Sequence, residues 1–404
     1  MTVLRRSAAV LAATTLIGAA TPAMTALAAD DPSPSASTVL PSGLFGSADP
    51  KFDGVWRQSL ALLAQRTVGV TPAAKAVDWL TGQQCANGSY AMFRPEPTPA
   101  CDAKVTVDTN STAAAVQALT AVGGHDDAVG RAVTWLKSQQ NKDGGWGYTP
   151  GSPSDTNSTS VVIGALTAAG ESPDSATYDL LAKWSVPCGQ DAGGALAYQP
   201  DKKGKLTANA DATAAGVLGA LGKGFMATAG NAPADGYLCA DSDKTLTRAQ
   251  VARNGARYLG DAMSPKGYLV STLAGAKPQP DYGNTADAVV AMAAQGWTKA
   301  AKKPYAWLET HAAQWARQSG PAAYAELIFA AHAMGADPRD FGGTNLVTAL
   351  DATGPAPEAA AKHTAEKKEK KSSGTGVWWV VGTGLVAGIG IGFLFSGRRK
   401  QRQP

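Results

Sequence analysis

The sequence predicts an all-α fold in which six helical hairpins close into a ring. One observation is a sequence motif that recurs at 108–119 and 155–166 and is predicted to start a helix each time. Each copy follows a helix with a tryptophan and two terminal glutamines, Trp79 before Gln83-Gln84 and Trp135 before Gln139-Gln140. A repeat of this length is typical of a helical-hairpin array. The other observation is helical apolar spacing, punctuated by Gly, Pro and Asp, without a convincing period-two strand.

The first 29 residues are typical of a secretory signal peptide. Arg5 and Arg6 form a basic start, residues 8–20 are apolar, and Ala26-Leu-Ala28 has the small-residue pattern of a cleavage site. Residues 30–43 follow as a flexible lead-in. We therefore expect an exported protein whose folded body covers residues 44–352.

Two kinds of helix are expected to alternate through that body. The inner helices are richer in Ala, Gly, Val and Leu, as expected for helices that are buried on most sides. The outer helices are expected near 72–84, 126–140, 174–185, 246–262 and 300–318. The inner helices are expected near 53–68, 109–122, 156–169, 211–226, 284–295 and 321–334.

This assignment leaves one helix without a partner at each end, 53–68 and 344–350. Pairing the two gives six hairpins and closes the ring. The alternative is an open arc, which would expose the apolar sides of both terminal units to water. We favour closure.

The starts of the inner helices share a polar pattern with two interpretations. Asp and Asn are good helix N-caps because their side chains accept free main-chain N–H groups. Capping alone does not require the further polar residues Asn110, Asn157 and Asp211, so the helix starts are also candidates for a ligand-binding rim. Aligned on the threonine, they read Asp108-x3-Thr112, Asp155-x3-Thr159, Asn209-x3-Thr213 and Asp281-x3-Thr285.

Glycine and aromatic residues recur in the loops between outer and inner helices. Glycine permits the positive φ that a chain reversal needs. The aromatic residues are expected to pack back over these turns. As an alternative, Trp146, Tyr148 and Tyr198 line the mouth of a cavity.

Four cysteines in an exported chain favour disulfides over metal ligands. Cys85 and Cys101 bracket one interhelical loop, while Cys188 ends a later helix and Cys239 precedes the next hairpin. We expect the pairs Cys85–Cys101 and Cys188–Cys239, although four cysteines allow three connectivities. No Cys-x-x-Cys or His-x-x-x-His spacing supports a zinc site.

The C-terminal region is predicted to anchor the body in a membrane. Residues 353–376 are rich in Ala, Lys and Glu and form a stalk, and residues 377–396 are apolar and long enough to cross a bilayer. The basic tail, 397–404, is expected to be cytoplasmic, which leaves the body outside the cell. Without the basic ends and the stalk, residues 30–352 carry a net charge of −4, which argues against a nucleic-acid partner.

The tryptophan helix with Gln139-Gln140, followed by Asp143-Gly-Gly-Trp146-Gly-Tyr148, resembles the repeat of the terpenoid cyclase and protein prenyltransferase superfamily. The resemblance covers roughly residues 44–352 and is most specific in the second repeat. It implies an α/α toroid around a central cavity. The same superfamily includes carriers of the transcobalamin type, which bind a corrinoid without a reaction, so the fold does not settle the function.

The resemblance also suggests which residues to test for activity. Class II cyclases of this family use Asp-x-Asp-Asp-Thr, whose middle Asp protonates an alkene. This chain has Asn110 and Asn157 at that place in two repeats, and only Asp211 supplies an acid there, without acidic neighbours. The zinc site of protein prenyltransferases has no counterpart among its histidines and cysteines.

We therefore expect a membrane-anchored surface protein whose central cavity binds a small molecule, without a metal or a cofactor. A corrinoid is one candidate ligand and an apolar molecule another, and a membrane transporter is a candidate recipient. The alternatives are a cyclase-like enzyme with Asp211 as its acid and a scaffold that docks a surface protein. The predicted ligand-binding residues are Asp108, Asn110, Thr112, Trp146, Tyr148, Asp155, Asn157, Thr159, Tyr198, Asp211, Asp281 and Thr285.

Overall fold

The computed structural model of the chain describes residues 41–95, 101, 105–231, 238–241, 245–271 and 277–359. The chain divides into residues 1–360 and 361–404, and the described residues all belong to the first unit. The predicted signal peptide, most of the lead-in, the membrane segment and the tail lie outside the described residues, as does the stalk beyond residue 359. Among the residues described, no helix is long and apolar enough to cross a bilayer.

Inner and outer α-helices alternate through the described residues, as the sequence predicts. The inner helices are α1 (Gly54–Thr67), α3 (Thr109–Val122), α5 (Thr156–Ala168), α7 (Ala210–Leu221), α9 (Tyr282–Ala294) and α11 (Pro321–Met334). The outer helices are α2 (Ala74–Gly82), α4 (Asp126–Ser138), α6 (Ser175–Lys183), α8 (Arg248–Met263), α10 (Thr298–Ser319) and α12 (Leu346–Asp351). Single 3-10 turns, η1 (Pro50–Phe52) and η2 (Pro338–Asp340), precede α1 and α12.

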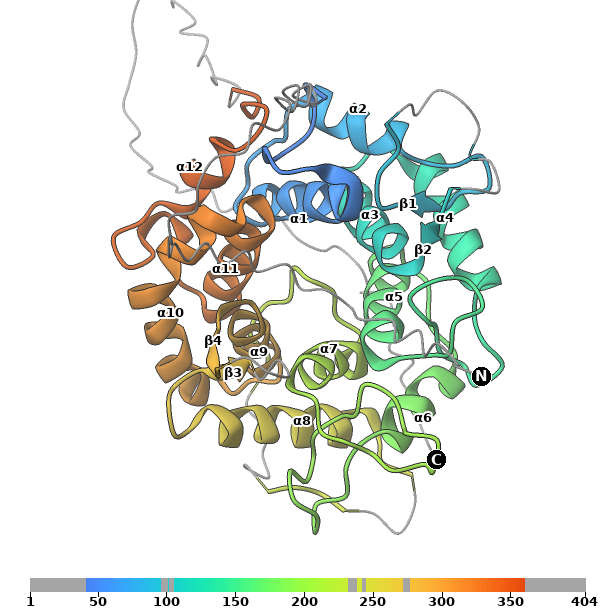
Figure 1. The fold of residues 1–404 in the computed structure, drawn as a ribbon, viewed down its shortest axis with the longest axis vertical. Helices are drawn as coiled ribbons and strands as arrows, with labels where there is room; N and C mark the ends of the chain where they lie inside the picture. Colours follow the sequence, from blue (N-terminus) through green and yellow to red (C-terminus); the bar gives the residue numbers. More distant parts are fainter. Residues whose placement is uncertain are drawn as a thin grey trace, which may run out of the picture. The chain divides into compact units, whose positions relative to one another are not determined.

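The inner helices form a closed ring within this unit (Figure 1). Each packs against the next inner helix in the chain, and α11 packs against α1 to complete the circle. At this seam the Gln65 side-chain amide also donates to Oδ1 of Asp351 in α12 at 2.7 Å. The contacts confirm closure and the α/α arrangement.

The outer helices cover the ring and differ from the inner helices in their apolar pattern. In α4, for example, the buried positions Ala132, Val133, Trp135 and Leu136 make one stripe. In α11 apolar side chains are buried around most of the circumference. The inner helices are therefore apolar on most sides because they pack against two inner neighbours and an outer layer.

Like the two 3-10 turns, the short strands of the structure were not predicted from the sequence. β1 (Tyr90–Ala91) pairs with β2 (Val107–Asp108), and β3 (Leu269–Ser271) pairs with β4 (Gln279–Asp281), both antiparallel. Each pair joins the two ends of a loop just before an inner helix. Strands of two or three residues are too short to display a period-two pattern.

The paired glutamines of the repeat fasten each loop to the next outer helix. The side-chain amide of Gln84 donates to the main-chain oxygens of Gly88 (3.0 Å) and Ala128 (2.8 Å), the latter in α4. The amide of Gln140 donates to the main-chain oxygen of Gly144 (2.9 Å) and to the side-chain hydroxyl of Thr177 (3.1 Å), the latter in α6. The recurrence of this glutamine thus has a structural cause.

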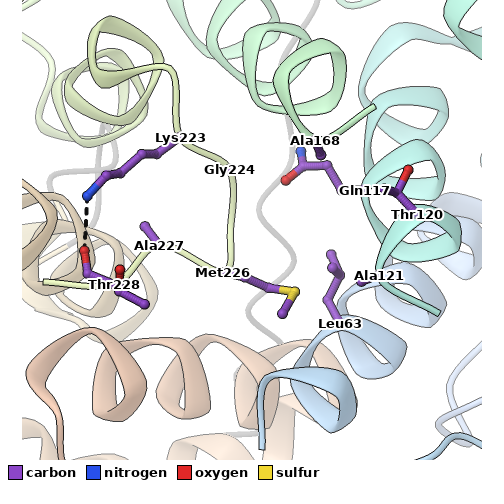
Figure 2. Close-up of a pocket in the computed structure, with 10 residues that line it drawn as sticks. All are labelled: Leu63, Gln117, Thr120, Ala121, Ala168, Lys223, Gly224, Met226, Ala227 and Thr228. Atoms are coloured by element: carbon purple, nitrogen blue, oxygen red, sulfur yellow. Dashed lines mark hydrogen bonds between the residues drawn. The ribbon is translucent and has the colours of Figure 1, made fainter. Parts of the chain in front are cut away.

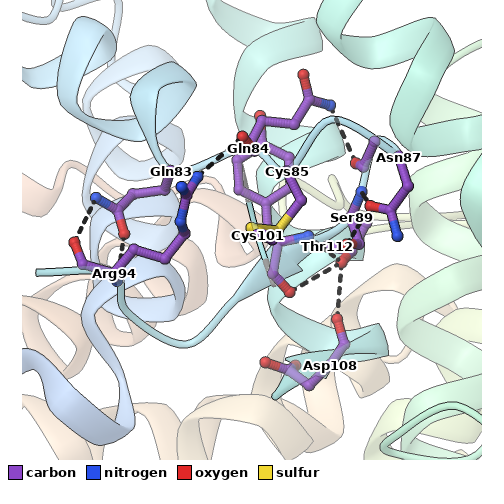
Figure 3. The surroundings of a disulfide bond; sticks show 11 residues. Gln83, Gln84, Cys85, Asn87, Ser89, Arg94, Cys101, Asp108 and Thr112 are labelled. Atoms are coloured by element: carbon purple, nitrogen blue, oxygen red, sulfur yellow. Dashed lines mark hydrogen bonds between the residues drawn. A yellow bond between two sulfur atoms is a disulfide. The ribbon is translucent and has the colours of Figure 1, made fainter. Parts of the chain in front are cut away.

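Both predicted disulfides are present, Cys85–Cys101 and Cys188–Cys239. Cys85–Cys101 closes the loop between α2 and β2. Gln83 binds the main chain of Arg94 beside it through both amide atoms (Figure 3). Cys188–Cys239 ties the loop after α6 to the segment before α8. The connectivity agrees with the one expected from the loop positions.

Candidate functional site

The starts of four inner helices share one capping geometry. In each, the cap side chain accepts the main-chain N–H three residues further on, so a free helix-end donor is satisfied. The distances are 2.6 Å for Asp108 and Ser111, 2.7 Å for Asp155 and Ser158, 2.8 Å for Asn209 and Ala212, and 3.2 Å for Asp281 and Asn284. The Asp or Asn of the repeat is therefore explained by its role as the N-cap of its own helix.

The threonine of the repeat also has a structural role. In all four repeats its hydroxyl accepts an N–H from the preceding loop, which locks that loop onto the helix. The hydroxyls of Thr112, Thr213 and Thr285 also donate to the main-chain oxygen of the cap residue, and that of Thr159 donates to the main-chain oxygen of Trp146 at 3.3 Å. The loop donors are Tyr90 for Thr112 (2.9 Å), Trp146 for Thr159 (3.0 Å), Leu196 for Thr213 (2.9 Å) and Leu269 for Thr285 (3.0 Å). The spacing Asp-x3-Thr thus follows from one helix–loop junction that is built several times.

The cap at Asp108 yields a stability prediction. Burial raises the pKa of this fully buried carboxyl to about 6, against the opposing effect of its hydrogen bonds to Ser111. Because Asn caps as well as Asp and carries no charge, Asp108→Asn should not lower the unfolding free energy at pH 5, whereas Asp108→Ala, which also loses the cap, should be about 1–2 kcal/mol less stable than Asp108→Asn.

The sign of the pH effect follows from the raised pKa. The folded protein holds a proton on Asp108 that the unfolded chain releases, so wild-type stability falls as pH rises from about 4 to about 6. The unfolding free energy of Asp108→Asn should therefore increase relative to that of the wild type over this pH range. Urea unfolding at pH 5 and pH 8 measures both effects, and an Asn variant as unstable as the Ala variant would contradict them.

A cavity of about 190 Å³ lies at the N-terminal ends of the inner helices. We call it the N-end cavity. The residue two positions after the cap reaches it in three repeats, as Asn110, Asn157 and Asp211. These are the polar residues that capping leaves unexplained, and the structure brings them together. The other lining residues are Trp56, Gln117, Ser160, Val161, Ala214, Ala215, Leu218, Lys223, Gly224, Phe225 and Asp287.

The fourth repeat has Gly283 at this position, and a carboxyl from another helix lies beside it. A Cβ built on Gly283 would lie 3.1 Å from Oε2 of Glu326, which belongs to α11. A side chain at residue 283 would thus compete with Glu326 for space. At the fourth helix start, the carboxyl of Glu326 from α11 thus lies beside the position at which the other three repeats carry a polar side chain.

Asp211, Asp281, Asp287 and Glu326 form a carboxyl cluster on α7, α9 and α11. Asp211 accepts the side-chain N–H of Asn157 at 2.5 Å. Burial, followed by the negative charges of Asp211 and Asp281, raises the pKa of Asp287 to about 7. Burial and the same kind of repulsion raise the pKa of Glu326 well above its usual range, and burial raises that of Asp211. Of these carboxyls, Asp287 therefore stays partly protonated up to near-neutral pH.

Asp287 and Glu326 were not among the predicted site residues. Both are half-buried inner-helix residues, and Asp287 faces the N-end cavity. One signal could have revealed them, because each is an isolated acid in an otherwise apolar stretch, 284–294 and 321–334. An acid in such a helix is costly to bury and therefore points to an internal polar site.

Several hydrogen-bond acceptors in the N-end cavity have no partner in the described structure. They are Oδ1 of Asn110, Oδ1 of Asn157 and Oγ of Ser160, each shielded from solvent. Ser160 is only 4 % exposed. The donation from Asn157 to Asp211 fixes which end of that amide is the acceptor. Unpartnered buried polar atoms are rare, and here three of them line one cavity.

The floor of this cavity is a segment that crosses the inside of the ring, residues 223–230, which we call the crossing segment. The sequence analysis extended the preceding helix to residue 226, but α7 ends at Leu221 because Gly222 adopts the left-handed conformation (φ 65°). The N–H of Phe225 donates to Oε1 of Gln117 in α3 at 3.0 Å, and its ring meets Trp56 of α1 edge-on at 5.5 Å. Gly230 donates to the oxygen of Ala293 in α9 at 2.9 Å.

On the other side of the crossing segment lies a second cavity of about 380 Å³, at the C-terminal ends of the inner helices. Figure 2 shows the segment from Lys223 to Thr228 on one side of this cavity and Gln117 and Leu63 on the other, with Lys223 Nζ donating to the oxygen of Thr228 at 3.1 Å. The crossing segment thus divides the inside of the ring into two compartments.

The aromatic residues proposed for a cavity mouth lie elsewhere. Trp146 is 1 % exposed, and its indole N–H donates to the oxygen of Leu136 at 2.7 Å, so it belongs to the core between α4 and α5. Tyr148 and Tyr198 are 39 % and 36 % exposed, and neither lines the two cavities. Tyr198 hydrogen-bonds to the carboxyl of Asp155. In the described part of the chain, no His, Cys, Asp or Glu residues are grouped to hold a metal ion.

Residues 108–182, which include α3 to α6, match the family model of the squalene-hopene cyclase C-terminal domain. A search of curated protein sequences gives no match. Among solved structures, the chain is similar to the type II terpene cyclase MstE from Scytonema, at 14 % identity over 66 % of this chain and 72 % of that one, with a TM-score of 0.43.

Two further solved structures are similar to the chain. One is an ent-copalyl diphosphate synthase from Streptomyces platensis (14 % identity, 70 % of this chain and 50 % of that one, TM-score 0.44). The other is a sugar epimerase from a ruminal bacterium (15 % identity, 67 % and 80 %, TM-score 0.42). These values are too low to carry an argument, so the family rests on the sequence match. Residues 108–182 thus match a domain of the terpenoid cyclase and prenyltransferase-like superfamily.

Proposed function

We propose that the protein binds a small molecule in the N-end cavity and acts as a binding protein. The observation that carries this proposal is the set of buried, unpartnered acceptors on Asn110, Asn157 and Ser160. Leaving such groups without a partner costs about 1–3 kcal/mol each, and a ligand that donates hydrogen bonds would recover that cost. Their positions on α3 and α5 make them a preformed surface for such a ligand.

The volume of the cavity narrows the class of ligand. About 190 Å³ is below the roughly 300–1,000 Å³ that is usual for drug-sized ligands. A corrinoid macrocycle is too large for this space, so the cavity favours a compact molecule. Trp56, Leu218 and Phe225 offer apolar contacts to its body. A polar head and a small apolar body fit this lining.

Surface display remains part of the proposal. The signal-like residues 1–29 and the apolar segment 377–396 would place the ring outside the cell and anchor it in the membrane. A bound ligand would then be held close to the membrane, where a transporter could receive it. Fractionation of the host's cells, with protease treatment of intact cells, tests this location.

One observation favours acid catalysis as a second function. The pKa of Asp287, raised to about 7, keeps this carboxyl partly protonated near neutral pH beside the apolar wall of the cavity. A neutral carboxylic acid in such a place can donate a proton to a substrate. The acid would then be Asp287 or Glu326 in addition to the predicted Asp211. Product formation from an isoprenoid that is lost in Asp287→Asn would favour this function over binding alone.

Native mass spectrometry of the full chain purified from its own host, without added ligand, tests the binding function. We expect a stoichiometric bound mass that is retained by Ala306→Leu, a change on the exposed face of α10, and lost in Ala215→Leu, which fills the cavity. A protein without a bound mass, or a bound mass that Ala215→Leu retains, would contradict the proposed site.

A further inference from the structure

We propose that the ligand of the N-end cavity is an organic cation, a small ammonium compound with N–H donors and a compact apolar body. This inference rests on the proposed binding function and names the class of ligand. Three independent features of the lining support it: an excess of acidic groups, acceptors without donors, and aromatic rings.

The first feature is charge. The carboxyl cluster combines acids from three consecutive inner helices, α7, α9 and α11, and no ion pair to any of its members occurs in the part of the chain that the structure describes. Lys223 lines the same cavity, but its amine donates to the main-chain oxygens of Thr228 (3.1 Å) and Ala294 (3.2 Å). Two members of the cluster, Asp211 and Asp287, line the cavity, and no cationic side chain lowers the pKa of Asp211, Asp287 or Glu326.

Helix dipoles do not supply the missing positive charge. The partial charge of a helix N-terminus acts within the first turn. Side chains cap the N-termini of α3, α5, α7 and α9, and Asp281 itself occupies the one at α9. Asp287 lies in the second turn of α9, beyond the reach of that effect. A bound cation would reduce the repulsion among these acids.

The second feature is that unpartnered polar atoms in the cavity lining are hydrogen-bond acceptors. Asn110 Oδ1 and Asn157 Oδ1 can only accept, and neither has a donor in the described structure. Ser160 Oγ, in a residue that is 4 % exposed, is also unpartnered and lines the same cavity. An ammonium group supplies several N–H donors and has no acceptor. Its hydrogen-bond pattern complements this set of oxygens.

The third feature is the aromatic wall. Trp56 and Phe225 line the cavity, and Phe225 stacks on Phe329 with the ring centroids 6.2 Å apart. The faces of such rings attract cations, and tryptophan attracts them most strongly. The rings can also cover the apolar body of the ligand. Carboxylates on one side and aromatic rings on another are suited to an organic cation more than to a hydrated metal ion.

The pH dependence of binding follows from the same groups. Of the elements packed against α9, α7 contributes Asp211 and α11 contributes Glu326, while Asp281 lies at the start of α9 itself; no charge on α8, α10 or β3 contributes to the shift at Asp287. A cation stabilises the ionised carboxylates, so its binding releases protons. Affinity should therefore rise as pH increases from about 5 to 8.

The test is titration calorimetry of the full chain with isopentylammonium and with isopentanol, which has the same carbon skeleton without a charge. We expect the amine to bind at least about tenfold more tightly than the alcohol at pH 8. The advantage should shrink at pH 5 and in both Asp287→Asn and Glu326→Gln, whereas Asp179→Asn on the exposed side of α6 should leave it unchanged. Circular dichroism of each variant checks that the ring is intact.

The outcomes separate the two proposals. If the alcohol binds as tightly as the amine and Ala215→Leu abolishes both, the cavity binds ligands but the inference of a cation is wrong. If neither compound binds, the cation inference also fails, and the proposed function is judged separately by the mass retained in the protein from its host. Unchanged amine binding in both acid variants overturns the assignment to the carboxyl cluster.

Discussion

Replacing Trp146 by alanine is expected to lower the free energy of unfolding by roughly 3–5 kcal/mol. The indole ring is 1 % exposed and is among the largest side chains that the core buries completely. The change would leave a cavity and would also leave the main-chain oxygen of Leu136 without its indole donor. The main-chain N–H of residue 146, which donates to the Thr159 hydroxyl, is retained in this variant, so the loss comes from the ring and its indole hydrogen bond.

Two variants separate the causes of this loss. Trp146→Phe keeps most of the ring volume but removes the hydrogen bond to Leu136, so it should cost about 1–3 kcal/mol. Tyr198→Ala, at another of the three aromatic positions predicted for a cavity mouth, should cost less because that side chain is 36 % exposed. Urea unfolding followed by circular dichroism measures all three. Equal losses for Trp146→Ala and Tyr198→Ala would contradict a core role for Trp146.

Asp287→Asn is expected to stabilise the ligand-free protein at pH 8 by roughly 1–3 kcal/mol. Burial and the neighbouring acids raise the pKa of Asp287 to about 7 in the folded protein. The unfolded chain loses this proton near pH 4, so the wild type loses stability as pH rises from about 4 to about 7. Asp287→Asn has no such loss. The difference in unfolding free energy between this variant and the wild type should therefore grow from pH 4 to pH 7 and then level off.

Thermal unfolding from pH 4 to pH 9 gives this profile. Asp179→Asn is the matched control, because Asp179 is exposed on α6. The thermal stability of Asp179→Asn should equal that of the wild type at every pH. A variant at Asp287 that is less stable than the wild type at pH 8, or a difference that does not change with pH, would show that the carboxyl cluster is not strained by repulsion.

The fold could be predicted largely because each helix start is specified locally. The Asp or Asn cap and the threonine four residues later make contacts close in sequence, as at Asp155 and Thr159, and the glutamines of the preceding helix reach the next outer helix. The closure of the ring was predicted from one unpaired helix at each end. The four short strands were missed, and one helix end was placed too late because the left-handed Gly222 was not recognised as a stop.

The candidate site was predicted in part. Asn110, Asn157 and Asp211 stood out because capping did not explain them, and they do line the N-end cavity. The cap residues and threonines belong to the same repeated motif, but they form the helix–loop junctions and do not line the cavity. Asp287 and Glu326 belong to no repeated phrase, and the closed ring brings their helices together. The crossing segment has no periodic pattern, so its place inside the ring could not be inferred from sequence.

The seam between α1 and α11 has a consequence for how the chain folds. Gln65 and Asp351, which hydrogen-bond there, are 286 positions apart, and Gly46 likewise donates to the oxygen of Thr353 at 2.7 Å. The first helix cannot bury its outer flank until the last hairpin has been synthesised, so ring completion is a late step with a large loop-closure entropy. The same proximity makes the ring a candidate for circular permutation, with residues 41 and 359 joined by a linker and new ends opened in an exposed loop.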